Sequence, residues 1–406
     1  MPNYEDLRAF FEESGELREI ASVAARSAIV TGFTIDVDPL WALLHDLGTG
    51  LVHRGAPAWL DDYFEFFPGL APPWYPEFVD LALRPESVWY GRSRGYRRRD
   101  LRYSDPRWED LRSFTRGRYG YDRLPIIMTV VHRPIRPPTR ETGGETDDQD
   151  QLRKLIGILN EVRVLVRVEE RPLPRFSCAA GDEIKTSGGK TGTLGGVLHD
   201  VSGGKTYGST CAHVAVTSDR VTDVSGNPVG QCIADTGRVP LSGTTVCDPI
   251  NLPLPHPYPG NGPSVNMLDC ALVDLTTTVS MPQLAGIAGA LAPGQDVIME
   301  GAQNRVHCKL GALAISYSFS EHGQDYCFRD VIELLPQPWG PFGGTLGRMT
   351  TTMPTQGDSG AWVLTDDAVP IWAALFFGED GQRGFAIRAS WVHDWAERAV
   401  RASLTV

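Results

Sequence analysis

The stretch Gln356-Gly357-Asp358-Ser359-Gly360-Ala361-Trp362-Val363 sets a serine in a glycine-containing turn, directly before an apolar run. Glycine at 357 and 360 suits a tight turn with unusual backbone dihedrals. Such a turn can present a serine hydroxyl together with backbone N–H groups. A serine hydroxyl is a poor nucleophile unless a neighbouring base removes its proton. The turn alone is a common sequence, so its meaning depends on whether the chain also supplies a base.

Two other short apolar frames supply the partners that a nucleophilic serine needs. His213 lies in Ser209-Thr210-Cys211-Ala212-His213-Val214, and Asp269 lies in Leu268-Asp269-Cys270-Ala271-Leu272-Val273. An imidazole that titrates near neutrality can accept the hydroxyl proton and return it. A carboxylate beside the ring would hold one tautomer and stabilise the imidazolium. Asp269 could equally be a buried capping carboxylate, and Asp274 is its nearest competitor for the triad position.

The three groups occur in the order His213, Asp269, Ser359, which is the order found in chymotrypsin-like peptidases. From about residue 180 to residue 406 the chain resembles the trypsin-like (chymotrypsin-fold) serine peptidases in their bacterial form. The resemblance implies two sequential β-barrels, with a boundary near residues 276–284, and Ser-His-Asp catalysis. It also implies an oxyanion hole formed by the backbone N–H groups of Gly357 and Ser359. It calls for no cofactor and no metal.

The resemblance also locates a substrate pocket. In this family the base of the pocket lies six residues before the nucleophile, and Met353 holds that position here. A thioether there predicts a preference for an uncharged, apolar side chain on the acyl side of the cleaved bond. The walls would be narrowed by Phe376, Phe377 and Phe385.

The texture from residue 180 onward is typical of a β protein. Short β-branched runs separated by glycine turns, such as 191–198, 297–299 and 331–335, favour a barrel or a sandwich. The Gly203-Gly204 turn ahead of His213 resembles the hairpin that leads to the catalytic histidine. Helical periodicity over residues 391–403 predicts a terminal helix.

Before residue 176 the pattern is mixed. Apolar positions at helical spacing predict one or two helices over 4–31, and a further helix begins near Asp38-Pro39. A strand over 126–131, a helix over 151–161 and a strand over 162–168 predict a small α/β unit. We therefore expect a multidomain α+β chain with a C-terminal double β-barrel: a mainly helical module over 1–125 with an aromatic core from 56–88, an α/β unit over 126–172 with a linker over 133–149, and a peptidase domain over 176–406.

The charge pattern bears on possible partners. A formal net charge of −12 argues against a nucleic-acid-coating protein. The segment 92–123 is rich in arginine and interleaved with aromatic residues, which is the composition of surfaces that follow phosphates and stack on bases. Acidic residues within the same segment favour a salt-bridged, solvated surface. An acidic protein partner and, less strongly, nucleic acid remain alternatives.

Cysteine usage and the N-terminal residues bear on the compartment. The first residues show no basic region followed by an apolar one, and no apolar run reaches the ~18 residues of a membrane span. Val214 stands where secreted members of the family have a cysteine after the catalytic histidine. We predict that all seven cysteines are free thiols in a cytoplasmic protein without membrane contact. The chain has no Cys-x-x-Cys pattern, so we expect no zinc site.

These patterns together predict a serine endopeptidase that hydrolyses protein or peptide substrates. The N-terminal module would regulate or target it, by receiving a regulatory protein partner. A catalytically silent or self-processing trypsin-fold protein that acts as a binding scaffold is the alternative. No Arg-Ile/Val-Val-Gly-Gly activation sequence precedes the peptidase half, so Asp358 would need another partner than a new N-terminus.

Overall fold

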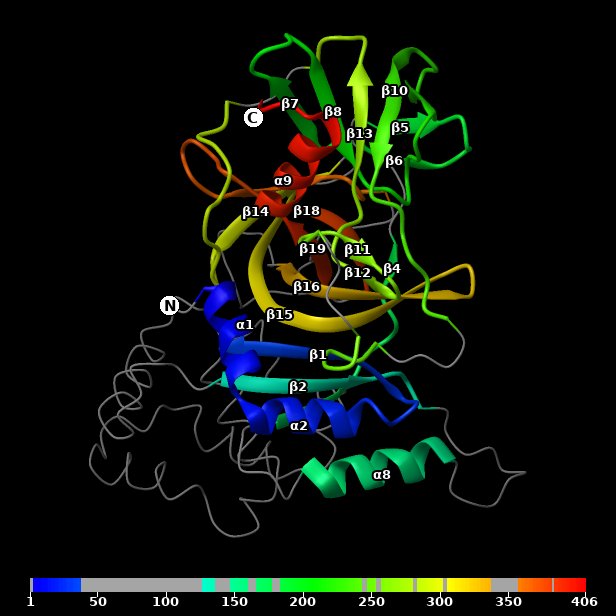
Figure 1. Cartoon of the computed structure of the whole chain (residues 1–406), viewed down its shortest axis with the longest axis vertical. Helices are drawn as coiled ribbons and strands as arrows, with labels where there is room; N and C mark the ends of the chain where they lie inside the picture. The colour runs from blue at the N-terminus through cyan, green and yellow to red at the C-terminus, as the bar shows by residue number, and fades with distance from the viewer. Residues whose placement is uncertain are drawn as a thin grey trace, which may run out of the picture. The chain divides into compact units, whose positions relative to one another are not determined.

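The structure is a computed structural model that describes residues 3–37, 126–135, 147–159, 166–176, 183–242, 247–252, 257–279, 283–301, 305–336, 357–381 and 383–406. The chain divides into two compact units. The N-terminal unit comprises Ala9–Arg171. The β unit comprises Asn3–Arg8 together with Pro172–Val406 (Figure 1). In the part of the chain that the structure describes, no helix is both long and apolar enough to cross a membrane.

The N-terminal unit contains the predicted strand-helix-strand arrangement. The strands β2 and β3 pair in parallel, and α8 connects them, as a βαβ crossover requires. An additional strand, β1, pairs antiparallel with β2 and was not predicted. The helix α8 begins inside the end of the predicted linker, and β3 begins later than predicted. The elements from the N-terminus are α1 (Tyr4–Glu13), α2 (Gly15–Ala24), β1 (Val30–Val37), β2 (Ile126–His132), α8 (Asp147–Leu159) and β3 (Val166–Glu170).

Three predictions for the N-terminal half lie outside the described residues. They are the helix near Asp38-Pro39, the aromatic core of 56–88 and the surface formed by the arginine-rich segment 92–123.

The first sheet of the β unit is antiparallel and carries both the His213 and the Asp269 frames. Its strand order is β20-β7-β8-β13-β10-β9-β5-β6. The described strands leave this sheet open, with β20 at one end and β6 at the other. Its strands are β5 (Glu183–Thr186), β6 (Thr191–Thr193), β7 (Gly196–Asp200), β8 (Thr206–Thr210), β9 (Arg220–Asp223), β10 (Pro228–Asp235), β13 (Ala271–Leu275) and β20 (Leu404–Thr405).

The second sheet of the β unit closes into a barrel. Antiparallel pairing runs around the ring β14-β15-β16-β19-β18-β17 and returns to β14. We call this ring the closed barrel. Its strands are β14 (Asp296–Glu300), β15 (Arg305–Glu321), β16 (Gln324–Pro336), β17 (Trp362–Thr365), β18 (Trp372–Glu379) and β19 (Gly384–Arg388). The short strands β4 (Arg175–Phe176), β11 (Asn261–Gly262) and β12 (Val265–Asn266) extend it. One closed barrel and one open sheet, with few helices, agree with the predicted double-barrel class.

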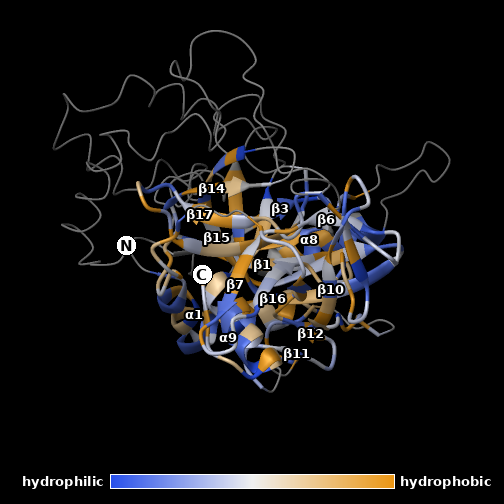
Figure 2. Ribbon diagram, turned by 90° about the horizontal axis from the view of Figure 1, so that it is seen from above, coloured by the Kyte–Doolittle hydropathy of each residue, from blue (hydrophilic) through white to orange (hydrophobic). Residues whose placement is uncertain are grey.

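Two local predictions for the β unit are confirmed. Strands β7 and β8 form an antiparallel hairpin around the Gly203-Gly204 turn, directly before His213. The terminal helix is α9 (Ala389–Val400). In Figure 2 hydrophobic residues follow strands such as β14 and β17, and hydrophilic residues are frequent in the loops.

The first residues of α1 belong to the β unit. The Tyr4 side chain is fully buried, and its hydroxyl donates to the carbonyl oxygen of Gly311 on β15 at 2.7 Å. Arg8 pairs with the buried carboxylate of Asp330 on β16 at 3.1 Å. Chain segments more than 300 residues apart in sequence thus form one structure. A chain shortened to start near Arg175 would lack Tyr4 and Arg8. The buried Asp330 carboxylate would then lose its ion pair with Arg8, which destabilises the fold.

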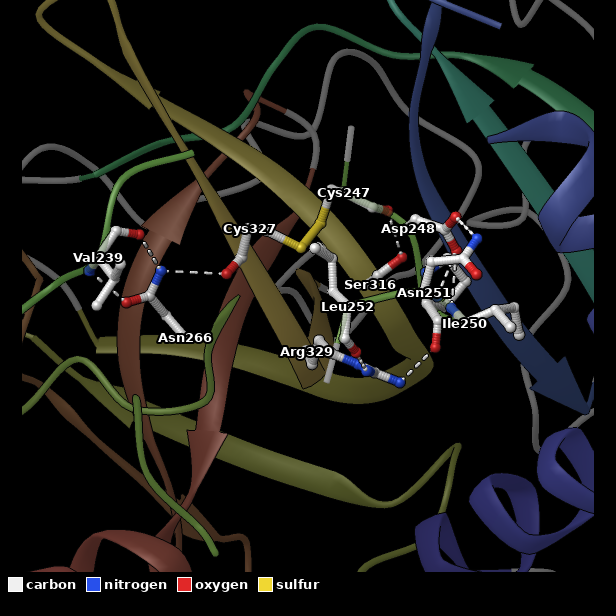
Figure 3. The surroundings of a disulfide bond; sticks show 11 residues. Val239, Cys247, Asp248, Ile250, Asn251, Leu252, Asn266, Ser316, Cys327 and Arg329 are labelled. Carbon is white, nitrogen blue, oxygen red and sulfur yellow. Dashed lines mark hydrogen bonds between the residues drawn. A yellow bond between two sulfur atoms is a disulfide. The ribbon is translucent and has the colours of Figure 1, made fainter. Parts of the chain in front are cut away.

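A disulfide joins Cys247 to Cys327, so the prediction of seven free thiols is wrong for these two residues. Figure 3 shows how the disulfide holds the segment 247–252 against the closed barrel. Ser316 donates to the Cys247 carbonyl oxygen at 3.0 Å, and the Arg329 guanidinium donates to the Leu252 carbonyl oxygen at 2.9 Å. Because disulfides persist mainly in oxidising compartments, the cytoplasmic prediction loses its support from free thiols. Cys211, Cys232, Cys270 and Cys308 are buried and form no disulfide, and Cys178 lies outside the described residues.

Candidate active site

His213 lies in a tight turn immediately after β8. The backbone N–H groups of Val214 and Ala215 both donate to the Cys211 carbonyl oxygen at 3.1 Å, which closes one helical turn. The Lys190 ammonium donates to the His213 carbonyl oxygen at 2.7 Å. His213 itself is fully buried. The backbone of His213 is therefore held by the hydrogen bonds of its turn and by Lys190, independently of the contacts of its ring.

The pairing of β8 with β13 brings Asp269 to His213. Thr210 at the end of β8 is in register with Ala271 at the start of β13. Because the strands are antiparallel, the residue just before β13 lies beside the turn that follows β8. Asp274 lies further along β13, opposite Tyr207, and its carboxylate pairs with Lys205 at 3.2 Å. Of the two candidate carboxylates, the structure brings Asp269 to the histidine.

Both carboxylate oxygens of Asp269 accept hydrogen bonds from His213. The ring Nδ1 lies 2.6 Å from Oδ2, and the backbone N–H donates to Oδ1 at 3.0 Å. This arrangement requires the proton of the neutral ring to be on Nδ1, which leaves Nε2 as the basic nitrogen. The carboxylate thus fixes both the orientation and the tautomer of the imidazole.

The environment of Asp269 favours its ionised form. Complete burial raises the pKa of the carboxyl. The charge of His213, its hydrogen bonds and the positive charge of Arg238 outweigh burial, so the pKa of Asp269 lies below its ordinary value of 3.8. A buried aspartate that remains ionised can stabilise an imidazolium as it forms.

Ser359 lies in the turn that precedes β17. Gly357 and Gly360 have φ values of 113° and 99°, a region that side chains with a Cβ rarely adopt. The Ser359 hydroxyl is within hydrogen-bond distance, 3.0 Å, of the Phe377 carbonyl oxygen on β18. Thr193 on β6 donates its backbone N–H to the Ser359 carbonyl oxygen at 2.9 Å. Both sheets of the β unit are therefore bonded to the serine turn.

Shared hydrogen-bond partners bring the serine turn to the histidine turn. The Phe376 carbonyl oxygen accepts from the backbone N–H of Gly360 at 2.9 Å and from the Cys211 thiol at 3.3 Å. Gly360 follows Ser359, and Cys211 lies two residues before His213. The structure thus bonds Asp269 to His213 and links the turn of Ser359 to the turn of His213 through the Phe376 carbonyl oxygen. His213, Asp269 and Ser359 are each fully buried.

The close approach of the two sheets depends on a glycine. A Cβ at Gly195 would lie 1.8 Å from the Gly360 carbonyl oxygen, which is backbone and cannot move aside alone. Glycine at position 195 therefore allows the loop between β6 and β7 to lie directly against the backbone of the serine turn. No local pattern in the sequence marks Gly195, because its contact at Gly360 lies more than 160 residues away in the chain.

The residues predicted to form the substrate pocket are only partly described. Met353 lies outside the described residues. Phe377 and Phe385 are fully buried in the aromatic interior of the closed barrel, where Phe319 lies 4.8 Å from the first ring and 5.1 Å from the second. Phe376 is also fully buried, and its ring lies against Gly384. Their role as pocket walls, and that of the Gly357 and Ser359 N–H groups as an oxyanion hole, stay predictions.

Two groups of possible metal donors occur among the described residues, and each group is held by other contacts. Donor atoms of Cys211, His213 and Asp269 lie within 4.8 Å of one another, but His213 and Asp269 are hydrogen-bonded to each other and the Cys211 thiol donates to Phe376. His393, Asp394 and Glu397 on α9 form the other group. There, His393 and Glu397 bond to the backbone of Leu404. We assign neither group as a metal site.

No known protein-family model matches the chain, and no curated protein matches it. Similar solved structures include Thermobifida fusca Protease A, which is 14% identical with a TM-score of 0.34 and is matched over 56% of this chain and 96% of that one. A Nocardiopsis protease is 11% identical with a TM-score of 0.32, over 56% of this chain and 98% of that one. Kallikrein-related peptidase 10 is 13% identical with a TM-score of 0.28, over 55% and 98%. Identities and TM-scores this low do not assign a function, which therefore has to follow from the contacts described above.

Proposed function

We propose that the β unit is a chymotrypsin-fold serine endopeptidase that hydrolyses protein or peptide substrates. The observation that carries the proposal is the pair of hydrogen bonds from His213 to the buried Asp269, together with the Phe376 carbonyl oxygen that accepts from both the Ser359 turn and Cys211. This arrangement makes the ring Nε2 a base and supports its protonated form.

The reaction proceeds through an acyl-enzyme. Nε2 of His213 takes the proton of the Ser359 hydroxyl as the oxygen attacks the carbonyl carbon of the substrate. The imidazolium then gives this proton to the amine, and the C–N bond breaks. A water molecule attacks the acyl-enzyme, with His213 again as base, and Ser359 leaves with the proton returned. Backbone N–H groups of Gly357 and Ser359 stabilise the oxyanion in both steps.

A fluorophosphonate probe tests this proposal directly. We expect covalent labelling of the full chain, loss of labelling in Ser359→Ala, and strongly reduced labelling in His213→Ala. Casein hydrolysis should follow the same order. A well-folded protein that is neither labelled nor active would support the alternative of a catalytically silent binding scaffold. Defined fragments of the chain itself, without turnover of added peptides, would instead indicate self-processing.

The proposal extends to specificity. With Met353 at the base of the pocket, the enzyme should prefer an uncharged, apolar side chain on the acyl side of the cleaved bond. A peptide library read by mass spectrometry measures this preference. A profile dominated by arginine or lysine at that subsite would contradict it.

The proposal also assigns control of the peptidase to the N-terminal unit, through a regulatory partner. The register of β1 and β2 offers a clean test, because Val37 and Ile126 are directly paired neighbours. A two-residue turn can therefore join the strands in place of residues 38–125 and leave Asn3–Arg8 on the β unit. We expect the full chain alone to be weakly active, and a partner bound to the N-terminal unit, or this deletion, to raise its casein hydrolysis rate. If the full chain and the deletion variant are both folded and hydrolyse casein at equal rates, with and without candidate partners, the deleted segment does not regulate activity. Its role would then be targeting alone.

A further inference from the structure

Arg238 follows β10, in a segment that two asparagine side chains hold in place. Asn261 donates its amide N–H to the Gly237 carbonyl oxygen. Asn266 accepts from the Val239 N–H at 2.7 Å and donates to the Val239 carbonyl oxygen at 2.8 Å. The residues on either side of Arg238 are thus each bonded to an asparagine. This fixes the backbone from which the guanidinium extends.

The same segment is bonded to the residues on either side of Asp269. The Asn261 side chain accepts from the Leu268 N–H at 3.0 Å and donates to the Leu268 carbonyl oxygen at 2.9 Å. Thr236 donates its N–H to the Cys270 carbonyl oxygen at 2.9 Å. The backbone segments that carry Arg238 and Asp269 therefore belong to one hydrogen-bonded unit.

The Arg238 side chain is placed by an ion pair and a ring. Its Nη2 lies 2.7 Å from Oε2 of Glu321, and the guanidinium carbon lies 4.8 Å from the centre of the Tyr326 ring. The side chains of Arg238 and Glu321 are 11% and 16% exposed, so solvent screens their charges only in part. Burial lowers the pKa of Arg238, but attraction by Asp269 and Glu321 raises it more, so the guanidinium stays charged.

We infer that Arg238 is a positioning residue whose fixed positive charge keeps Asp269 ionised and disfavours the resting imidazolium of His213. This inference rests on the proposed peptidase function. A base is useful only while its nitrogen is unprotonated before attack. A nearby cation that disfavours early protonation extends the pH range of the enzyme on its acid side.

Several other titratable or charged groups surround the His213–Asp269 pair among the described residues. Lys190, directly before β6, donates to the His213 carbonyl oxygen. Burial raises the pKa of the Cys270 thiol well above its ordinary value, so this thiol is neutral. Other such groups are Cys211 beside the ring, Asp235 on β10, and Glu321 and Tyr326 beside Arg238. Arg238 and Glu321 thus act on the pair with opposite signs.

The pH dependence of kcat/KM separates this electrostatic role from a structural one. Removal of the Arg238 charge stabilises the imidazolium, so Arg238→Gln should move the acid limb to higher pH, by about half to one pH unit. Arg238→Lys keeps the charge and should restore most of the limb. Glu321→Gln removes the anion that offsets Arg238, so its acid limb should move to lower pH. If Arg238 has a purely structural role, Arg238→Gln and Glu321→Gln should both lose activity, and their acid limbs should not shift in opposite directions.

A titration of His213 by NMR makes the test independent of hydrolysis. In a Ser359→Ala background, the Cε1 signal of His213 is identified by its absence in His213→Ala. We expect its titration midpoint to rise with Arg238→Gln and to fall with Glu321→Gln. An unshifted midpoint, or shifts of the same sign, would overturn the role of Arg238. If the wild-type chain does not hydrolyse peptides, the peptidase proposal fails, and this titration still decides the electrostatic role.

Discussion

The closed barrel and the first sheet of the β unit are filled in different ways. The barrel interior holds aromatic rings in direct contact, with Phe328 and Phe377 at 4.8 Å and Tyr317 and Phe385 at 5.1 Å. A buried cluster of the first sheet consists of small side chains, namely Ala215, Cys232 and Ala271. None of the largest fully buried side chains in the described part of the chain lies in the first sheet.

This difference in filling corresponds to a difference in function. Small residues let backbones approach closely, and a Cβ at Gly230 would lie 2.2 Å from the Asp274 carbonyl oxygen. The first sheet therefore positions His213 and Asp269 mainly through backbone and polar hydrogen bonds. The aromatic barrel supplies the rigid strand β18, against which the Ser359 turn is bonded.

Trp362 connects the two regions. Its indole N–H donates to the Ser209 hydroxyl on β8 at 2.7 Å, and its ring stacks on Trp372 with centroids 4.0 Å apart. A Cβ at Gly196 on β7 would lie 2.3 Å from the indole, so the ring lies directly on this glycine. One aromatic side chain of the barrel therefore inserts into the region of small residues, close to both turns of the site.

The largest expected effect removes the chemistry and leaves both regions folded. Ser359→Ala, His213→Ala and Asp269→Asn should each lower kcat/KM by about 10⁴-fold or more, because triad members act as a unit. Double variants should lose little more than single ones. Peptide hydrolysis and thermal unfolding together check this. Undiminished labelling of Ser359 in His213→Ala would remove the histidine from its assigned role.

The next prediction compares the aromatic interior of the closed barrel with the small buried side chains of the first sheet. Phe319→Ala should lower the free energy of unfolding by about 3–5 kcal/mol, because it opens a cavity in the aromatic barrel. Cys232→Ala removes only one sulfur atom from the first sheet and should cost on the order of 1 kcal/mol. Urea unfolding of both variants measures the difference. Equal losses would show that the two interiors contribute alike.

A backbone contact between the regions provides a sharper test of the site. Gly195→Ala places a methyl group against the Gly360 carbonyl oxygen and should displace the Ser359 turn, with a loss of about 1–3 kcal/mol in stability. We expect the protein to stay folded at room temperature while its rate of peptide hydrolysis falls strongly. Gly289→Ala is the matched control, because a Cβ there meets no atom within 4 Å. If both variants retain full activity, the close approach at Gly195 does not set the position of the serine.

The smallest effect concerns acid. The pKa of Asp269 is lowered in the folded state, so its contribution to stability is complete above about pH 4 and is lost as the pH falls through the folded-state pKa. Below about pH 4, the free energy of unfolding of wild type should therefore fall more steeply with decreasing pH than that of Asp269→Asn. Denaturant titrations at several pH values check this. Parallel curves for the two proteins would mean that Asp269 is not held ionised by its surroundings.

Local patterns in the sequence predicted the elements whose contacts are near in the chain. The hairpin before His213, the parallel β2-α8-β3 unit and the helix α9 follow from turn residues and periodicity. The frames of His213, Asp269 and Ser359 were also visible, because each combines a reactive side chain with apolar neighbours that become turn and strand.

Tertiary structure alone decided which distant residues act together. The Cys247–Cys327 disulfide joins residues 80 apart, and the start of α1 completes the β unit at Gly311. Asn261 bonds the residue before Arg238 to the residue before Asp269. β1 was missed for a related reason, because a strand is defined by its partner, and its partner β2 follows far along the chain. The physical reason is the same in each case. The free energy of such a contact depends on strand pairing and burial set by the whole fold, and no local pattern of residue types records it.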